Sequence, residues 1–251
     1  MHLEICNFSG RIPAHLNRQV INILSALGIP DQAFIDLQSE YLLKSDITHL
    51  TDSWRAKRNF NSLPARIGKL VEAGFSSDEP YLLTLIKSFK WKRINEMRSL
   101  ARIGVAKGQY SIGVVDEYDV LEEGTIFYQQ STENGPRVLT GPMAVNRSPS
   151  LHPGDVRCVT AVDHPELRHM VDVLVFSQRG HMPVSAACSG GDLDGDLYLL
   201  LWDERLVPKA QEQPAEYESS AQGASSSDDV GIKFQEMTQF FVDYTFSSKL
   251  G

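Results

Sequence analysis

The stretch ACSGGDLDGDLYLLLW, residues 187–202, places three aspartates at alternate positions immediately before an apolar run. These aspartates are Asp192, Asp194 and Asp196. An extended strand would point all three carboxylates the same way, and a tight loop would bring them closer still. Clustered carboxylates repel one another unless a proton or a cation compensates their charge. Mg²⁺ prefers oxygen ligands, so the pattern predicts a magnesium site, and Gly195 allows a sharp bend or the close approach of a substrate.

Two other interpretations apply to these aspartates. An EF-hand calcium loop needs glycine at its sixth position and glutamate at its twelfth, but counting from Asp192 these positions hold Leu197 and Asp203. The apolar residues 197–202 also predict a buried strand where an EF-hand continues into a helix. An ordinary acidic turn at the surface stays open from the triplet alone, because turns often carry aspartate and glycine.

The chain around this stretch divides into regions of different pattern. Residues 1–100 contain apolar side chains spaced three and four apart, as in HLNRQVINILSALGI, and predict a helical region. Residues 101–208 contain glycines and short β-rich runs, which predict a compact barrel or small sandwich. The serine-rich residues 209–229 predict a flexible linker or loop, and residues 230–251 predict the start of a truncated helical region. The expected class is therefore α+β.

The bulk composition fits one large domain or two small ones, because the chain has 251 residues and is 42% hydrophobic. Its formal net charge of −8 argues mildly against a dedicated nucleic-acid binder. Basic residues nevertheless gather between positions 87 and 107, interrupted only by Glu96. These residues are Lys87, Lys90, Lys92, Arg93, Arg98, Arg102 and Lys107. They predict either contact with a phosphate backbone or a solvated helix face.

No stretch of the sequence indicates export or membrane insertion. There is no apolar run long enough for a membrane span, and the first residues lack a basic region followed by an apolar stretch. The 3 cysteines have no CxxC spacing, so neither a disulfide framework nor a zinc site is expected. We therefore expect an intracellular protein, cytoplasmic or nuclear, with no membrane partner.

A second stretch, AVNRSPSLHPGDVRCVT, presents polar groups on a stiff loop. Pro149, Pro153 and Gly154 restrict its backbone, so Arg147 becomes a rigidly presented planar donor suited to ribose hydroxyls or phosphate. His152 is open to three interpretations: a phosphate donor, a more remote spacer, or a residue that caps the loop. By itself, such a histidine is more often structural.

Together these stretches resemble the cellular RNA-dependent RNA polymerases of eukaryotic RNA silencing. NRSPSLHPGDVR is similar to the family's Arg-x-Pro-x-x-His-Pro-Gly-Asp-x-Arg block, and CSGGDLDGDLYLLLWDERLVP to its Asp-x-Asp-Gly-Asp signature with the tail that follows. LNRQVINILSALGIPDQAF and ARIGVAKGQYSIGVVDEYDVLEEGTIFYQ are similar to two earlier blocks. The first two motifs also resemble segments in the largest subunit of multisubunit DNA-dependent RNA polymerases.

The resemblance implies a double-psi β-barrel and RNA-templated synthesis of RNA. It implies that the catalytic Asp192, Asp194 and Asp196 hold one Mg²⁺ and that a second Mg²⁺ arrives with the nucleotide, both stabilising an in-line displacement. The substrate-binding residues it implies are Arg147, Pro149, His152 and Gly195, with Arg147 contacting the incoming ribose. The implied partners are template RNA, nascent RNA and nucleoside triphosphates, with single-stranded DNA as another possible template.

The chain also departs from these families. Gly190 stands where the multisubunit enzymes have asparagine, and Gln109 stands where we expect arginine after Lys107. In the family the active site lies between two barrels, and the other barrel supplies lysines that grip the triphosphate. We therefore expect the chain to need that missing first barrel and to be inactive alone. The alternative is a non-catalytic RNA-binding or interaction remnant that uses the basic residues 87–107. A hydrolytic nuclease is disfavoured, because no general base accompanies the aspartates.

Overall fold

The computed structural model describes residues 9–45, 65–76, 79–215 and 238–239. The chain forms two compact units, and every helix and strand treated below belongs to the first, residues 1–215. The linker predicted for residues 209–229 is described only as far as residue 215. Of the helical segment predicted for residues 230–251, only residues 238–239 are described. The remainder of both predictions lies outside the described residues.

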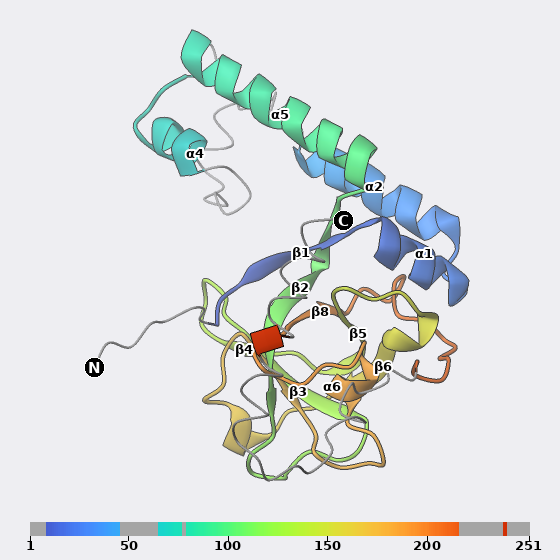
Figure 1. Ribbon diagram of the computed structural model, residues 1–251. Coiled ribbons are helices and arrows are strands. Elements are labelled where there is room, and N and C mark those ends of the chain that lie inside the picture. Colours follow the sequence, from blue (N-terminus) through green and yellow to red (C-terminus); the bar gives the residue numbers. More distant parts are fainter. Residues whose placement is uncertain (1–8, 46–64, 77–78, 216–237, 240–251) are drawn as a thin grey trace. The chain divides into compact units, whose positions relative to one another are not determined.

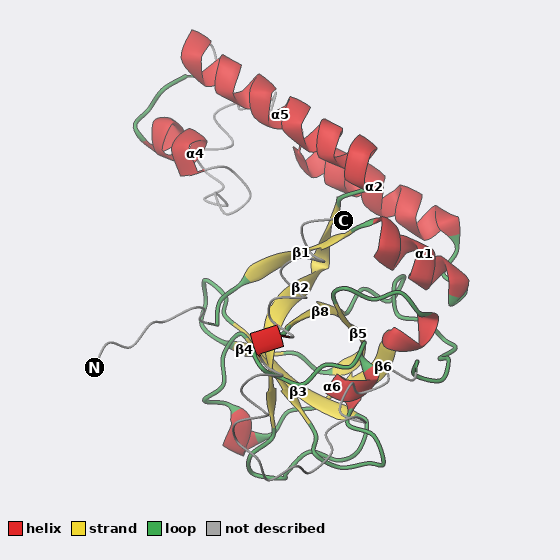
Figure 2. Ribbon diagram, in the orientation of Figure 1, coloured by secondary structure: helices red, strands yellow, loops and turns green. Residues whose placement is uncertain are grey.

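Helices dominate the first part of the unit and strands the second (Figures 1 and 2). The helices are α1 (Arg18–Ala26), α2 (Asp31–Ser45), α4 (Ala65–Glu72), α5 (Pro80–Leu100) and α6 (Val184–Ala187), with 3-10 turns η2 (Pro153–Asp155) and η3 (Pro165–Leu167). The strands are β1 (Ile12–Leu16), β2 (Ile103–Val115), β3 (Thr125–Gln130), β4 (Arg137–Val138), β5 (Gly141–Arg147), β6 (Arg157–Ala161), β7 (Val173–Phe176) and β8 (Leu197–Leu201). No described helix has both the length and the apolar character needed to cross a membrane.

A closed barrel is formed by β2, β7, β3, β6, β5 and β8, because β8 returns to pair with β2. The β2–β7 and β3–β6 pairs are parallel, and the other pairs around the ring are antiparallel. Strand β7 lies between the consecutive strands β2 and β3, and β2 lies between β7 and β8. This interleaved connectivity is that of the predicted double-psi barrel. The predicted α+β class is confirmed, and the barrel, not the small sandwich, is correct.

Two features differ from the sequence prediction. Residues 12–16 form strand β1 inside the stretch expected to be helical, and helix α1 begins only after Asn17, whose side chain accepts a hydrogen bond from the Val20 amide at 2.9 Å. The reason is tertiary, because β1 pairs with β2 and buries Ala14 and Leu16 there. The first of the short runs expected after residue 101 is in fact one long strand, β2, which pairs with β1, β7 and β8 along its length. The later strands of this region are short, as predicted.

Strand β8 holds two hydrophobic cores together. Leu199 and Leu201 join the cluster formed by α1, α2 and β1, whereas Tyr198 and Leu200 join the cluster inside the barrel. Side chains alternate between the faces of a strand, so β8 is buried on both sides, as the apolar run predicted. Each fully buried side chain of this kind contributes about 1.5–3 kcal/mol. The aspartate loop is therefore attached directly to a rigid element.

Gly113 of β2 makes room for the aromatic pair in the barrel. A Cβ at this position would overlap the rings of Tyr198 and Phe176. The two rings meet edge to face, with centroids 4.8 Å apart. A glycine at this point of β2 thus allows the largest side chain of β8 to pack under the loop that precedes it.

Candidate metal centre

The three predicted carboxylates converge in a loop between α6 and β8. One oxygen from each of Asp192, Asp194 and Asp196 lies within 4.8 Å of the others. Asp192 and Asp194 are exposed, and Asp196 is partly buried. The loop is bent, because Leu193 has a φ of 62° and Gly195 a φ of 116°. Leucine rarely adopts the left-handed region, so the fold holds this residue in a strained conformation.

The electrostatics of the loop favour a cation. The charges of Asp192 and then Asp196 raise the pKa of the exposed Asp194 carboxyl. A bound cation would remove this repulsion. Every ligand atom of the group is a carboxylate oxygen, which is the ligand type that Mg²⁺ prefers. The residues present therefore fit a magnesium ion.

Arg147 connects the two ends of the loop. Its Nη2 lies 2.7 Å from Oδ1 of Asp196, and its Nη1 donates to the Ser189 carbonyl at 2.9 Å. The contact follows from strand pairing, because Arg147 ends β5 beside Tyr198 of the neighbouring strand β8. The hydrogen bond to Asp196 raises the pKa of the guanidinium, so the arginine keeps its charge. The predicted substrate-binding arginine thus lies at the carboxylates.

The predicted Pro149 and His152 lie on the loop that follows β5, and both are exposed. Ser189 ties this loop to the aspartate loop, since its hydroxyl donates to the Pro149 carbonyl at 2.7 Å. Nδ1 of His152 accepts a hydrogen bond from the Gly154 amide at 3.0 Å. His152 therefore caps the turn η2 in this structure, as one of its three interpretations had it.

Asp155 is a supporting residue that sequence reasoning missed. Its carboxylate is fully buried and accepts the amides of Leu151 and His152, each at 3.0 Å. Together with His152 it forms a reciprocal capping box around η2. The signal was present in the sequence, because a carboxylate three residues after a capping side chain is the signature of such a box.

The floor under the aspartate loop is made by Tyr198 and Gly191. The Tyr198 hydroxyl is buried without a hydrogen-bond partner, as are both polar side-chain atoms of the neighbouring Asn146. Burial, followed by the charge of Asp196, raises the pKa of Tyr198, so its hydroxyl stays protonated. A Cβ at Gly191 would overlap this hydroxyl. The loop can approach the tyrosine so closely only because residue 191 is glycine.

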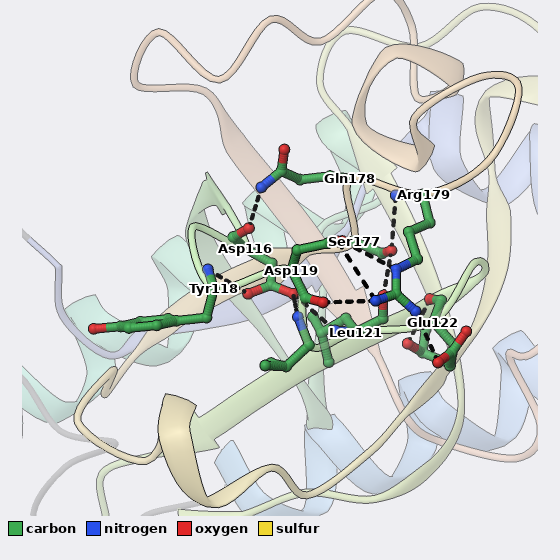
Figure 3. Close-up of polar contacts among 10 residues, drawn as sticks. Asp116, Tyr118, Asp119, Leu121, Glu122, Ser177, Gln178 and Arg179 are labelled. Atoms are coloured by element: carbon green, nitrogen blue, oxygen red, sulfur yellow. Dashed lines mark hydrogen bonds and ion pairs between the residues drawn. The ribbon is translucent and has the colours of Figure 1, made fainter.

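A polar network fixes the segment that leads into α6, and it too was missed (Figure 3). Asp116 is fully buried and accepts three amides at distances of 2.7–3.1 Å, those of Tyr118, Val120 and Leu121. Ser177 donates to the Leu121 carbonyl at 2.9 Å. Arg179 forms ion pairs with Asp119 at 3.0 Å and Glu122 at 2.8 Å. Exposed ion pairs are worth little, so the buried Asp116 is the main anchor.

Comparisons with known proteins identify one family. A family model described as RNA dependent RNA polymerase matches residues 1–251. RNA-dependent RNA polymerase 1 of Arabidopsis thaliana is 35% identical over 261 residues, which are 99% of this chain and 23% of the relative. RNA-dependent RNA polymerase 1 of Schizosaccharomyces pombe is 33% identical over 280 residues, again 99% and 23%. The solved structure of RNA dependent RNA polymerase QDE-1 from Thielavia terrestris matches with a TM-score of 0.61 and 27% identity, over 84% of this chain and 27% of that one. The chain spans about a quarter of the length of these relatives.

Proposed function

The chain belongs to the RNA-dependent RNA polymerase family, and on that premise we propose that it forms the catalytic barrel of such an enzyme. The proposed reaction is RNA-templated transfer of nucleotides from nucleoside triphosphates to the 3′-hydroxyl of a growing RNA, in the service of RNA silencing. The observation that carries the proposal is the convergence of three carboxylates within 4.8 Å on the loop before β8.

We propose that Asp192, Asp194 and Asp196 hold Mg²⁺. One of two ions would lower the pKa of the attacking hydroxyl, and the other would neutralise charge on the pyrophosphate leaving group; the second ion would arrive with the nucleoside triphosphate. The part played by the protein is positional. Strand β8 anchors the end of the loop at Asp196, and Arg147 ties this aspartate to Ser189 at the other end. The carboxylates are therefore arranged before any substrate arrives, which reduces the entropic cost of reaching the reactive geometry.

Arg147, Pro149, His152 and Gly195 are the proposed substrate contacts. The Arg147 side chain is 24% exposed and lies beside the carboxylates, which supports contact with a ribose hydroxyl there. Apart from its own chain neighbours, no described residue has an atom within 4 Å of the position that a Cβ of Gly195 would occupy, which leaves room for a substrate backbone. The exposed positions of Pro149 and His152 next to this loop support the same assignment.

The full reaction needs more than this chain. We propose that a second barrel, outside the 251 residues, supplies the groups that grip the triphosphate, and that this chain alone is inactive. Template RNA, nascent RNA and nucleoside triphosphates are the proposed partners, with single-stranded DNA as another template. The proposed location is inside the cell, in the cytoplasm or the nucleus.

Replacing Asp196 by Asn in a complete polymerase that contains this segment tests the proposal. We expect nucleotide incorporation to be lost while circular dichroism and RNA binding are kept. A matched control is Asp163→Asn, because Asp163 is an exposed aspartate that pairs with Arg168 instead of joining the metal group. If the Asp196 variant still extends RNA at the wild-type rate, the metal assignment is wrong.

A further inference from the structure

Helix α5 buries one side and exposes the other. The residues that pack in one cluster with α4 are Leu82, Leu85, Ile86 and Phe89, and Met97 is also buried. On the other side, Leu83, Lys87, Trp91, Ile94 and Arg98 are exposed. These five residues are spaced three and four apart and therefore share one face, which we call the outer face of α5. Trp91 is 69% exposed, which is unusual for so large an apolar side chain.

The structure divides the basic cluster that the sequence predicted. The guanidinium carbon of Arg93 lies 4.4 Å from the centroid of the Phe89 ring. Nζ of Lys92 lies 3.9 Å from Oε1 of Glu96. Lys107 belongs to strand β2, where its charge helps to lower the pKa of Asp203. These basic side chains are thus engaged within the fold.

The outer face of α5 keeps two cations on either side of an aromatic ring. Within the described part of the chain, Lys87 and Arg98 have no ion-pair partner. They stand four residues before and seven residues after Trp91, which places the three side chains along one line of the helix surface. From Lys87 to Arg98 this line is about 16 Å long, at 1.5 Å per residue.

Charge complementarity indicates what covers this face. Between residues 80 and 107 there are seven basic residues and one acidic residue, in a chain whose formal net charge is −8. Glu96, the acidic one, does not belong to the outer face. Such segregation favours a polyanion as the partner. A flat aromatic ring between cations is also the combination with which proteins bind single-stranded nucleic acids.

We propose that the outer face of α5 binds a single-stranded segment of RNA. Lys87 and Arg98 would contact phosphates, and a base would stack on Trp91. The inference rests on the proposed function only for the choice of RNA, which is the polymer that the barrel would act on. The surface itself lies outside the metal centre and contains none of its residues.

A binding titration of the 251-residue chain tests this inference. Fluorescence anisotropy of a labelled single-stranded RNA oligonucleotide is measured at several salt concentrations in EDTA, so that the carboxylate loop contributes no bound cation. For K87Q/R98Q we expect the slope of log K against log salt to decrease in magnitude by about 1.4, because each phosphate contact to a single strand contributes roughly 0.7. For W91A we expect roughly tenfold weaker binding, and for W91F most of the loss should be recovered.

Lys92→Gln is the matched control, since Lys92 lies on the same helix but is directed to Glu96. It should leave both affinity and salt slope close to those of the wild type. The proposal is overturned if K87Q/R98Q and W91A bind as the control does. It is also overturned if RNA binding is unchanged while W91A alters the sedimentation of the chain, which would identify a protein contact. Because EDTA removes divalent cations, the result of this titration is independent of nucleotide incorporation by the Asp196 variant.

Discussion

Nη2 of Arg147 lies 2.7 Å from Oδ1 of Asp196, and this pair connects two neighbouring barrel strands at the carboxylate loop. The arginine ends β5, and the aspartate immediately precedes β8. The guanidinium therefore compensates part of the negative charge that Asp192, Asp194 and Asp196 bring together. It also competes with any cation for the Asp196 carboxylate, and this competition can be measured.

Replacing Arg147 by Ala should raise the affinity of the loop for Mg²⁺ while lowering nucleotide incorporation by a complete polymerase. Loss of one positive charge beside the carboxylates is worth about 1 kcal/mol after solvent screening, or roughly a fivefold tighter Kd. Incorporation should fall because Asp196 and Ser189 lose the group that positions them. Calorimetric titration with Mg²⁺ gives the affinity, and Arg168→Ala, at an exposed ion pair, is the control. Unchanged Mg²⁺ affinity would contradict this account.

Replacing Asp194 by Asn should distinguish two effects of this carboxylate: the charge repulsion that it causes in the loop and the stabilisation that it gives when Mg²⁺ binds. The pKa of Asp194 is raised by the charges of Asp192 and Asp196, so its ionised form is disfavoured in the folded chain. Without a divalent cation, the variant should therefore melt no lower than the wild type. With Mg²⁺, the wild type should gain thermal stability and the variant should gain little. Thermal unfolding with and without Mg²⁺ checks both parts, and an equal gain in both proteins would refute the prediction.

Replacing Gly191 by Ala should destabilise the fold, because the added methyl group overlaps the residues beneath the aspartate loop. The new methyl group overlaps the Tyr198 hydroxyl and lies 2.7 Å from the Ser185 carbonyl oxygen. Overpacking of this kind costs about 1–3 kcal/mol. Tyr198→Phe removes the overlapping oxygen, so the double variant should recover part of the loss. Urea unfolding of both single variants and the double variant gives the coupling energy, and strictly additive effects would show that the two residues do not meet.

Stability should depend on pH through Asp203. The Arg205 side chain donates to this carboxylate at 2.8 Å and also pairs with Glu40 at 2.6 Å. The hydrogen bond from Arg205 lowers the pKa of Asp203 below its ordinary value of 3.8. Because the pKa is lower in the folded chain than in the unfolded chain, the ionised carboxylate stabilises the fold. This stabilisation is fully present at pH values above the pKa of Asp203 in the unfolded chain. This stabilisation is lost as the pH falls through the folded-state pKa.

Asp203→Asn should therefore be less stable than the wild type at pH 7, by about 1–2 kcal/mol, because Arg205 is partly exposed. The difference should begin to shrink below about pH 4, where the carboxyl of the unfolded chain takes up a proton. It should vanish only at lower pH, below the lowered folded-state pKa of Asp203. Urea unfolding at pH 7, 5 and 3 measures the difference in the free energy of unfolding between the two proteins, provided that both are still folded at the lowest pH. A difference that stays constant across this range would exclude the ionised pair as its cause.

Local sequence patterns were sufficient to predict the metal-binding chemistry of the aspartate loop and the α+β class of the fold. Three aspartates before an apolar run predicted both the converging carboxylates and a strand buried on both faces, and β8 has this burial. Local patterns failed for β1, because its burial depends on pairing with β2, and residues 109 and 110 of that strand are far away in the sequence. The buried carboxylate of Asp116 was also missed, because its partners are backbone amides, which every sequence contains. Asp155 was missed although the spacing of its capping box was present in the sequence.

The sequence by itself determined the donor chemistry of this protein: three carboxylates, a stiff loop carrying Arg147, and a basic segment on a helix. These are properties of residue type and short-range spacing. Only the tertiary structure decided how they are used. Closure of β8 on β2 sets the barrel, and the pairing of β5 with β8 brings Arg147 to Asp196. Packing of α5 selects Lys87 and Arg98 as the cations of its outer face. Such outcomes depend on contacts between residues distant in the chain, and no local pattern records them.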